Sequence, residues 1–342
     1  MTILMVSPSH NSNIGGAEIQ LNKLIKLLRK KNVTIISKKS EKCNNLLYPY
    51  NYLIKVIFSI IKNKYKIIHI HTFSSPAWII AFFNFYLNRK ILIKITLAGS
   101  NSRLGKISSS YFLKVLFNMF FRSKDIYFVA LNKKIKGELI RLGIKRSNIF
   151  NIPNGVEILK NKPKERKKSD LIFFGRLIKR KNVFELLKLI HKKKLNHIKL
   201  DIYGEGPEKQ LIKSYIIEKR LKNISLNNFI SNQKIINKLK KTRFSINTSK
   251  SEGMSNAILE SISQGVPVIC CDIAENRYLI KNYFNGYIFK DMKDLYRILK
   301  NLSRMKNYKK ISSNAFNSAN QYNIKNIAEI YKKKYKKLLL KN

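Results

Sequence analysis

The stretch Glu252–Pro267, EGMSNAILESISQGVP, decides the fold class of this chain. It follows an apolar run at Arg243–Thr248 and leads into another at Val266–Cys271, so the pattern predicts a strand, a sharp turn through Ser-Glu-Gly, a helix and a further strand. A helix that begins at such a turn leaves its first backbone N–H groups unpaired at the carboxyl end of a parallel sheet. These groups favour an anionic ligand.

Two carboxylates, Glu252 and Glu260, bracket this helix start. They would lie roughly 12 Å apart if every residue between them were helical, which is too far for both to contact one atom of a small ligand. They could contact the two ends of an elongated ligand whose phosphates lie over the helix start, and a nucleotide sugar has that shape. The spacing alone equally fits an ordinary solvated helix.

The composition indicates a globular chain of two domains. It has 342 residues, 44% of them apolar, which is enough for two cores of ordinary size. Lys and Arg number 69 against 19 Asp and Glu, a formal charge of +50 that favours anionic partners. Lys, Asn and Ile are enriched together along the whole chain, as an AT-rich genome would produce, so the basicity says little about mechanism.

Cysteine usage and hydropathy place the chain in a reducing compartment. The three cysteines, Cys43, Cys270 and Cys271, have no metal-site spacing, and we expect free thiols in the cytoplasm. The opening MTILMVSP lacks the basic region of a secretory signal and is predicted to be a buried strand. The sequence contains no run of about 20 apolar residues, so we expect no membrane-spanning helix.

Strands and helices are expected to alternate in both halves. In the first half the predicted strands are Thr2–Ser7, Val33–Ser37, Ile67–His71, Ile91–Leu97, Ile126–Leu131 and Ile149–Pro153. After a charged linker at residues 161–170, the second half repeats the pattern with Leu171–Phe174, Ile198–Tyr203, Ser225–Ile230, Arg243–Thr248 and Val266–Cys271. We predict domains at residues 1–158 and 168–318, and a helix at 319–342 that returns to the first domain.

Several loops at predicted strand ends carry residues suited to a phosphate ligand. Gly15-Gly16 stand before a helix, where glycine lets the backbone approach a ligand, although two glycines often form only a turn. Gly175-Arg176-Leu177 follows a strand, with Lys181 six residues after the glycine. Guanidinium and ammonium groups suit a diphosphate, but in so basic a chain such a pair is also common surface decoration.

These motifs together resemble those of the retaining glycosyltransferases of family four, the glycosyl transferases group 1. SEGMSNAILESISQGVPVI is similar to the family's SEG-x6-EA-x3-G-x-PVI signature. The family's GGAE loop, its strand ending in H-x-H, its I-P-N-G-V segment, its G-R-L-x-x-x-K loop and its G-x-G-P turn also have counterparts here. The resemblance implies the GT-B fold, in which two doubly wound Rossmann-like α/β domains face an interdomain cleft.

The resemblance also implies roles for individual residues. We expect catalytic roles for Arg176, Lys181 and Glu252, which would stabilise the departing diphosphate and hold the sugar. The expected donor-binding residues are Gly15, Gly16, Gly175, Gly204, Ile230, Gly253, Met254, Ser255, Asn256, Ala257, Ile258 and Glu260. The expected sugar or acceptor contacts are His71, Gly99 and Ser100, although His69 and His71 could equally be structural histidines.

The sequence departs from the family pattern at four positions. Ala98 stands where many members have a His near the donor hexose, and Asn182 replaces a Gly. Glu275 replaces another Gly, and Tyr278 replaces an acid. The identity of the sugar and the choice of acceptor are therefore open.

Two aromatic segments, Pro76–Arg89 and Tyr111–Arg122, carry Lys or Arg at their edges. They fit either core helices of the first domain or helices that lie in a bilayer interface.

The function expected from the sequence is the transfer of a hexose from a nucleotide sugar to a hydroxyl of a glycan or lipid-linked acceptor, with retention and without a metal or other cofactor. The setting would be cell-surface polysaccharide assembly in the cytoplasm or on the inner face of the plasma membrane, with an anionic membrane surface as a further partner. The alternative is a non-catalytic, basic scaffold at the membrane with a degenerate fold. No nucleic-acid-binding motif is present, so we expect no such partner.

Overall fold

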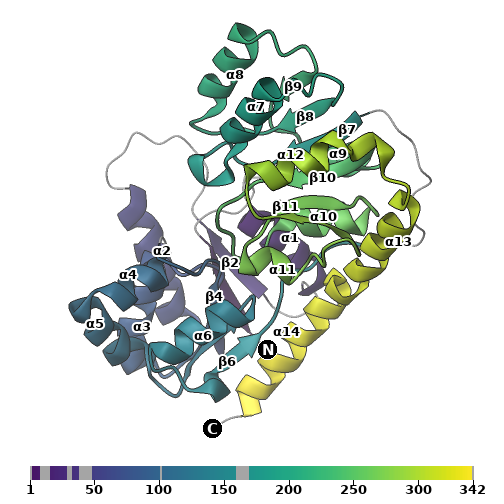
Figure 1. The fold of residues 1–342 in the computed structure, drawn as a ribbon. Coiled ribbons are helices and arrows are strands. Elements are labelled where there is room, and N and C mark those ends of the chain that lie inside the picture. Colours follow the sequence, from purple (N-terminus) through teal and green to yellow (C-terminus); the bar gives the residue numbers. More distant parts are fainter. Residues whose placement is uncertain are drawn as a thin grey trace. The chain divides into compact units, whose positions relative to one another are not determined.

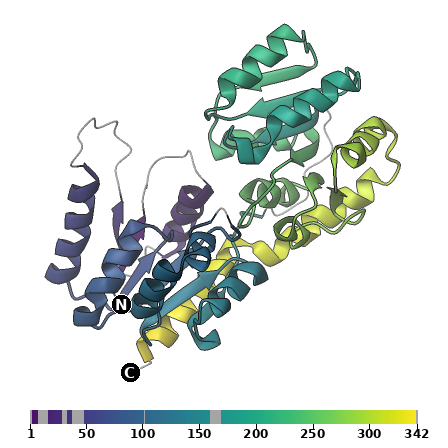
Figure 2. The same cartoon turned by 60° about the vertical axis from the view of Figure 1, so that its left-hand side comes forward.

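The computed structural model describes residues 2–7, 16–28, 33–37, 48–100, 102–158 and 169–340. The chain divides into two compact units, unit 1 at Met1–Gly155 with Ile324–Asn342, and unit 2 at Val156–Asn323. In both, a parallel six-stranded sheet carries helices on its two faces (Figures 1 and 2). This confirms the expected fold class of two doubly wound α/β units. The predicted linker at 161–170 lies mostly outside the described residues, but Ser169 and Asp170 already belong to a strand.

The sheet of unit 1 has the strand order β2-β1-β3-β4-β5-β6. Its strands are β1 (Ile3–Ser7), β2 (Val33–Ser37), β3 (Ile67–Ile70), β4 (Lys90–Ile95), β5 (Ile126–Ala130) and β6 (Ile149–Asn151). Its helices are α1 (Gly16–Leu28), α2 (Tyr48–Lys62), α3 (Ser75–Leu87), α4 (Arg103–Ser109), α5 (Tyr111–Phe121), α6 (Lys133–Arg141) and α14 (Ile324–Leu340), with a 3-10 turn η1 (Arg146–Asn148).

The two faces of this sheet are covered by different helices. On one face, α1 and α14 pack over a core that includes Met5, Leu92 and Tyr331. On the other, Phe117 and Phe121 of α5 lie within ring-contact distance of Phe128 on β5. The strands are apolar on both sides because both faces are covered, as is usual for parallel sheets.

The sheet of unit 2 has the order β12-β11-β10-β7-β8-β9. Its strands are β7 (Ser169–Phe174), β8 (Leu200–Tyr203), β9 (Ile224–Asn227), β10 (Thr242–Asn247), β11 (Val268–Cys271) and β12 (Gly286–Phe289). Its α-helices are α7 (Val183–Lys192), α8 (Lys209–Glu218), α9 (Asn232–Leu239), α10 (Asn256–Ser263), α11 (Ala274–Arg277), α12 (Met292–Lys300) and α13 (Tyr308–Ala319). The 3-10 turns are η2 (Lys179–Lys181), η3 (Leu302–Arg304) and η4 (Asn320–Tyr322).

Alternating side chains of the strands build two cores in unit 2. Leu171 and Phe173 of β7 face the core formed with α7, α8 and α12. Ile172 and Phe174 face the other side, where α9 packs. This alternation fixes which side chains face each of the two helix layers.

The strand order of unit 2 reverses at β7, which lies between β10 and β8. In doubly wound sheets, ligands bind at the carboxyl ends of the strands beside such a reversal. The loops after β7, β8 and β10 therefore mark the edge where a ligand is expected.

Three further expectations concern membranes, cysteines and one strand end. No helix among the described residues has the length and hydropathy needed to cross a bilayer. Cys270 and Cys271 are free thiols, and Cys43 lies outside the described residues. The strand expected at Ser225–Ile230 ends at Asn227, because Asn227 turns its amide back to the Ile202 carbonyl.

Candidate functional site

The loop after β7 brings Arg176 to the carboxyl edge of the unit 2 sheet. Gly175 has φ +151°, a conformation that favours glycine, and its N–H donates to the Tyr203 carbonyl at the end of β8. Arg176 follows with an exposed side chain. The backbone thus presents one guanidinium at the strand-order reversal.

A second cation of the same loop region, Lys181, is paired with Glu252. Lys181 ends η2, and its Nζ lies 2.5 Å from Glu252 Oε1 in the loop after β10. Arg180 Nη1 lies 3.7 Å from Glu252 Oε2 and donates to the Ser251 carbonyl at 2.7 Å. The structure therefore brings the expected catalytic residues Lys181 and Glu252 together across 71 positions of sequence.

The main chains of these two loops are also joined. The Thr248 hydroxyl donates to the Lys181 carbonyl at 2.7 Å, and the Lys250 N–H donates to the Arg180 carbonyl at 3.0 Å. An ideal Cβ on Gly175 would lie 3.9 Å from Lys181 Cε, so the ammonium stem runs beside the loop that carries Arg176. This arrangement positions the pair before any ligand binds.

Glu252 is ionised in this environment. The carboxylate is 6% exposed, and its burial raises its pKa, but Lys181 and Arg180 outweigh that effect and hold the pKa below its ordinary value. A carboxylate with a low pKa and two cationic neighbours is a weak base. It suits hydrogen bonding to hydroxyl groups better than proton abstraction.

Helix α10 begins immediately after this loop. Ser255 is its N-cap, and its hydroxyl accepts from the Ile258 N–H at 3.5 Å and from Asn247 Nδ2 at 2.9 Å. Gly253, Met254, Asn256 and Ala257, all expected donor contacts, lie around this helix start. The structure therefore groups this predicted set with Glu252 at one end of α10.

Glu260 lies further along α10 and is 5% exposed. Its Oε1 accepts from Asn232 Nδ2 at 2.6 Å, and Asn232 is the first residue of α9. The sequence reasoning missed Asn232, because an Asn after a Ser at a helix start is typical of capping and gives no functional signal. The contact fixes the orientation of the Glu260 carboxylate.

Close packing explains two of the glycines in this region. A Cβ on Gly204 would lie 2.1 Å from the Gly175 carbonyl oxygen, and one on Gly206 would lie 2.3 Å from the Leu177 carbonyl oxygen. Both glycines are required for the loops after β7 and β8 to meet. Gly204 therefore has a packing role in addition to the donor contact expected from the sequence.

Ile230 lies between β9 and α9, and it lines a hollow of about 410 Å³ with Tyr203 and Asn227 at the strand ends. The hollow is at the carboxyl edge of β8 and β9, on the same edge as the other expected donor residues. A flat base could lie there against Ile230 and the backbone.

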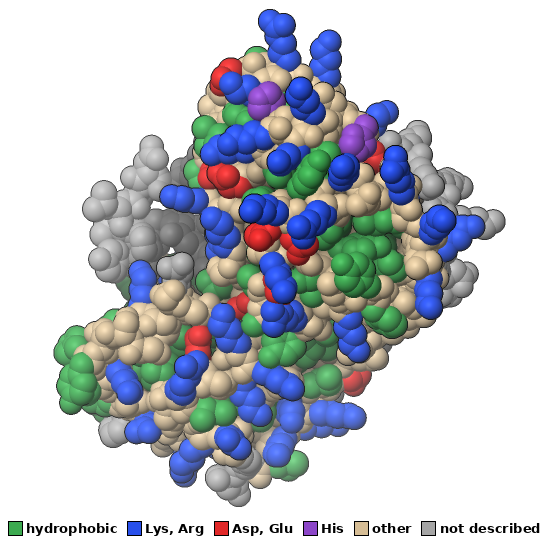
Figure 3. Space-filling model, in the orientation of Figure 1, with side chains coloured by type: hydrophobic (Ala, Val, Ile, Leu, Met, Phe, Trp, Pro, Cys, Tyr) green, Lys and Arg blue, Asp and Glu red, His purple; other side chains and the backbone are tan. Residues whose placement is uncertain are grey.

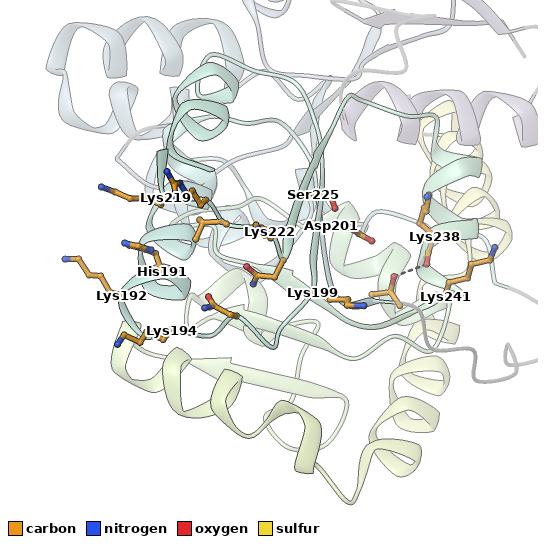
Figure 4. Close-up of a pocket in the computed structure, with 15 residues that line it drawn as sticks. His191, Lys192, Lys194, Lys199, Asp201, Lys219, Lys222, Ser225, Lys238 and Lys241 are labelled. Carbon is orange, nitrogen blue, oxygen red and sulfur yellow. Dashed lines mark hydrogen bonds between the residues drawn. The ribbon is translucent and has the colours of Figure 1, made fainter. Parts of the chain in front are cut away.

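A larger hollow of about 1060 Å³ lies at the opposite edge of unit 2. It lies at the amino ends of β8, β9 and β10, and in Figure 4 lysines surround it while Lys199 and Asp201 lie between them. Several of these lysines follow the last turns of α7 and α8, where cations are favoured by the helix dipole. The helix dipoles therefore explain the positive charge of this hollow. The hollow lies at the amino ends of the strands, whereas ligands of doubly wound sheets bind at the carboxyl ends.

The expected sugar or acceptor residues belong to unit 1. His71 directly follows β3 and is 1% exposed, and its pKa lies well below its ordinary value because of burial and the nearby Lys94 and His69. Gly99 has φ +94°, and its N–H donates to Glu138 Oε1 at 2.8 Å, whereas Ser100 is exposed. Gly16 is the first residue of α1, and Gly15 lies outside the described residues.

His69 has a structural role. Its Nδ1 lies 2.7 Å from the Tyr335 hydroxyl on α14, and its ring packs against Tyr331. Burial and Lys94 lower its pKa to about 3, so the ring is neutral at physiological pH. Of the two alternatives for this residue, the structure favours the buried structural histidine.

The positions that depart from the family pattern differ in exposure. Ala98 and Glu275 are buried at 4% and 3%, whereas Tyr278 is 40% exposed at the end of α11. Asn182 has φ +57°, which explains why the family favours glycine there. Among the residues that the structure describes, no three His, Cys, Asp or Glu side chains form a cluster that could hold a metal.

Lys94 is a buried cation that the sequence reasoning missed. It lies on β4, 3% exposed, and its Nζ donates to Asn154 Oδ1 at 2.9 Å. Burial lowers its pKa to about 7. The second Lys of KILIKI, which is flanked by isoleucines inside the strand, was the available signal.

We predict that Lys94 makes the stability of the chain rise with pH. An unfolded Lys keeps its proton up to its ordinary pKa of 10.5, whereas the folded residue loses it near 7. Between these values the unfolded chain binds more protons, so the free energy of unfolding increases with pH by up to about 1.4 kcal/mol per pH unit. The melting temperature between pH 7 and 9 measures this rise, and Lys94→Met should flatten it.

The matched control is Lys66→Met, an exposed lysine of the same unit. Its curve should follow that of the wild type. An equal slope in the wild type and in Lys94→Met would contradict the assignment.

Residues 156–321 match the family model of glycosyl transferases group 1. The poly(ribitol-phosphate) alpha-N-acetylglucosaminyltransferase of Staphylococcus aureus is 28% identical over 188 residues, and the match covers 48% of this chain and 37% of that protein. The GtfA subunit of the UDP-N-acetylglucosamine–peptide N-acetylglucosaminyltransferase of Streptococcus agalactiae is 27% identical over 145 residues, covering 41% of this chain and 28% of that protein.

Among solved structures, Anabaena HepE in complex with UDP and glucose has a TM-score of 0.77 and 17% identity, with 98% of this chain and 99% of that chain covered. At this identity the likeness shows the fold. The matches to the two curated relatives span 37% or less of their length. Residues 156–321, most of unit 2, therefore match the glycosyl transferases group 1 family, and the chain as a whole has the GT-B fold.

Proposed function

We propose that the chain is a retaining glycosyltransferase that moves a hexose from a nucleotide sugar to a hydroxyl of a glycan or lipid-linked acceptor. The observation that carries this proposal is the grouping of Arg176, Lys181 and Glu252 with the start of α10 at the strand-order reversal of unit 2. The Streptococcus agalactiae relative is named for UDP-N-acetylglucosamine and HepE was solved with UDP, so a UDP-sugar is the first donor to test.

The chemistry follows from the charges at this edge. The bond between the anomeric carbon and the phosphate oxygen breaks, and the leaving diphosphate gains negative charge. Arg176, Lys181 and the N–H groups of the α10 start would stabilise that charge, and such electrostatic stabilisation supplies most of the rate enhancement in many enzymes. In the ligand-free pair Lys181 contacts Glu252, so a bound diphosphate would share this ammonium with the carboxylate.

Retention is supported by the state of Glu252. Two cations hold this carboxylate ionised, so it is a poor base and a poor nucleophile. We propose that it holds sugar hydroxyls, while the acceptor oxygen bonds to the anomeric carbon and the departing phosphate oxygen takes the acceptor proton on the same face of the sugar. Cations already supply the stabilising charge, and the proposal requires no metal ion or other cofactor.

The proposed setting is cell-surface polysaccharide assembly in the cytoplasm, with the chain peripheral on the inner face of the plasma membrane. The support is the acceptor class named for the Staphylococcus aureus relative, a poly(ribitol-phosphate), and the basic charge of +50. The alternative, a non-catalytic scaffold, would lack turnover while keeping the fold.

The decisive measurement is UDP release from UDP-glucose and UDP-N-acetylglucosamine, together with thermal shifts produced by UDP, GDP and ADP. We expect one nucleotide to stabilise the chain and its sugar to be turned over. Stabilisation by UDP without any release from either UDP-sugar would favour the scaffold, and no stabilisation by any of the three nucleotides would contradict donor binding.

A further prediction concerns Glu260 and the affinity for the donor. We propose that the Glu260 carboxylate accepts hydrogen bonds from the ribose hydroxyls of the donor. We expect Glu260→Gln to raise the donor KM by roughly 10- to 100-fold with a smaller change in kcat, because such a charged hydrogen bond contributes about 1.5–3 kcal/mol. Glu218→Gln, an exposed acid on α8, is the control. An unchanged KM in Glu260→Gln would remove Glu260 from the donor site.

A further inference from the structure

Two neighbouring helices of unit 1, α3 and α5, expose an apolar surface. We call it the α3–α5 face, and its residues are Phe82, Phe83, Tyr86, Tyr111, Phe112, Val115 and Met119. The helices are in contact, since the rings of Phe82 and Phe120 lie 5.6 Å apart. In Figure 3, hydrophobic side chains gather at the edge of the molecule where Figure 1 places α5.

The exposure on this face is high for such residues. Tyr111 is 85% exposed, Phe112 68% and Met119 63%. Of the seventeen large hydrophobic side chains exposed among the described residues, ten lie between positions 54 and 119. Single exposed apolar residues are normal, whereas a contiguous group indicates an interaction surface.

Packing within unit 1 does not account for these residues. The inward side of α5 is filled by Phe117 and Phe121, which pack against Trp78 of α3 and Phe128 of β5. A surface helix of a globular protein normally turns polar residues to solvent. On α5, however, the outward side also carries apolar side chains, and these are exposed to solvent.

The charges beside the face have one sign. Residues 48–124 contain twelve Lys and Arg and no Asp or Glu. Lys114 is exposed and lies three positions after Tyr111, so these two side chains are neighbours on α5. Arg122, the C-cap of α5, is also exposed, and its Nε donates to the Gly143 carbonyl. Lys106 and Lys124, before and after α5, are also exposed.

We propose that the α3–α5 face docks on the surface of an anionic lipid bilayer. Its aromatic and aliphatic side chains enter the headgroup region, and the surrounding lysines and arginine lie over the lipid phosphates. We infer a bilayer as the partner because the face combines exposed aromatic rings with neighbouring Lys and Arg and no Asp or Glu. Exposed rings alone would also fit a protein partner, and positive charge alone would also fit a polyanion. The inference rests on the membrane setting of the proposed function and names the surface that would bind there, but it does not depend on the transfer reaction.

The apolar part is tested by co-sedimentation with vesicles of phosphatidylglycerol and phosphatidylcholine. The variant is Phe112→Ser, Val115→Ser and Met119→Ser combined, and we expect vesicle partitioning to fall by at least about tenfold. The matched control replaces three exposed apolar residues of unit 2, Leu211→Ser, Ile217→Ser and Tyr283→Ser, and should bind like the wild type. Circular dichroism confirms that both variants fold.

The charged part is tested by two variants of equal net charge. One changes Lys106, Lys114 and Lys124 to Gln beside the face, and the other changes Lys192, Lys194 and Lys222 to Gln in unit 2. Both reduce the formal charge of +50 by three. We expect only the first to weaken binding to phosphatidylglycerol vesicles by several-fold, with the difference vanishing on pure phosphatidylcholine.

Three results would overturn the proposal. The first is equal loss in the two charge variants, which would mean that overall basicity drives binding. The second is unchanged vesicle binding by the triple serine variant. The third is a wild-type dimer that the triple serine variant converts to a monomer without any effect on vesicle binding, since the face would then be a contact between two copies of this chain.

Discussion

Arg176→Ala is expected to lower kcat by about 10²- to 10³-fold, while the donor KM changes much less. Arg176 is exposed in the loop after β7, so its removal should leave the fold unchanged. A guanidinium that stabilises charge on the leaving diphosphate acts mainly in the transition state, and its loss therefore appears in kcat. The measurement is steady-state UDP release from whichever UDP-sugar the wild type turns over.

Two variants accompany this prediction. Lys179→Ala removes an exposed cation of the neighbouring turn η2 and should retain wild-type turnover. Arg176→Lys keeps the charge but loses the planar fork, so partial activity is expected. A kcat for Arg176→Ala equal to that of the wild type would remove this residue from the mechanism.

The second large effect is expected from Lys181→Met, which leaves the Glu252 carboxylate buried with only Arg180 near it, at 3.7 Å. We expect a loss of roughly 1–3 kcal/mol of stability at neutral pH, less than for a fully buried pair because the Lys181 side chain is 14% exposed. Turnover should fall as well, since this ammonium also faces the proposed diphosphate site.

The pH dependence distinguishes this effect from a general packing defect. In the wild type, the pKa of Glu252 lies below its ordinary value of 4.5, so its ionised form stabilises the fold above that pH and this stabilisation is lost as the pH falls through the lower folded value. In Lys181→Met, burial still raises the pKa while the main counter-charge is gone. The variant should therefore be most destabilised, relative to the wild type, at neutral pH.

Scanning calorimetry of the full chain between pH 4 and 7 measures this difference. The double variant Lys181→Met and Glu252→Leu should recover much of the melting temperature while staying inactive, because no buried charge is left unpaired. A deficit in Lys181→Met that does not vary with pH, or a double variant as unstable as the single one, would contradict the account.

Much of the fold could be predicted from local sequence patterns. The strands β2 and β10 were placed within one residue, since apolar runs between turn residues determine where strands begin and end. Strand β12 was not predicted, and other errors lie at element ends, as at Asn227 and Ser169, where side-chain hydrogen bonds and sheet pairing decide the boundary. Such boundaries depend on neighbouring strands that a local pattern does not contain.

The candidate site was predictable as a set of residues but not as a set of contacts. The sequence pattern named Lys181, Glu252 and Glu260, because strand-end loops and helix starts have local signatures. It did not pair Lys181 with Glu252 or Glu260 with Asn232, since these partners lie 71 and 28 positions apart. Spacing along a helix even suggested independent roles for the two acids.

The sequence by itself determined the alternation of strands and helices in two units and the loops that carry glycines and cations, because each depends on short-range periodicity and turn chemistry. Only the tertiary structure decided that Glu252 is an ionised, buried partner of Lys181, that Lys94 is buried, and that α5 turns an apolar side outward. Burial and pairing depend on which segments pack together, and that packing also sets the charge states on which the proposed chemistry depends.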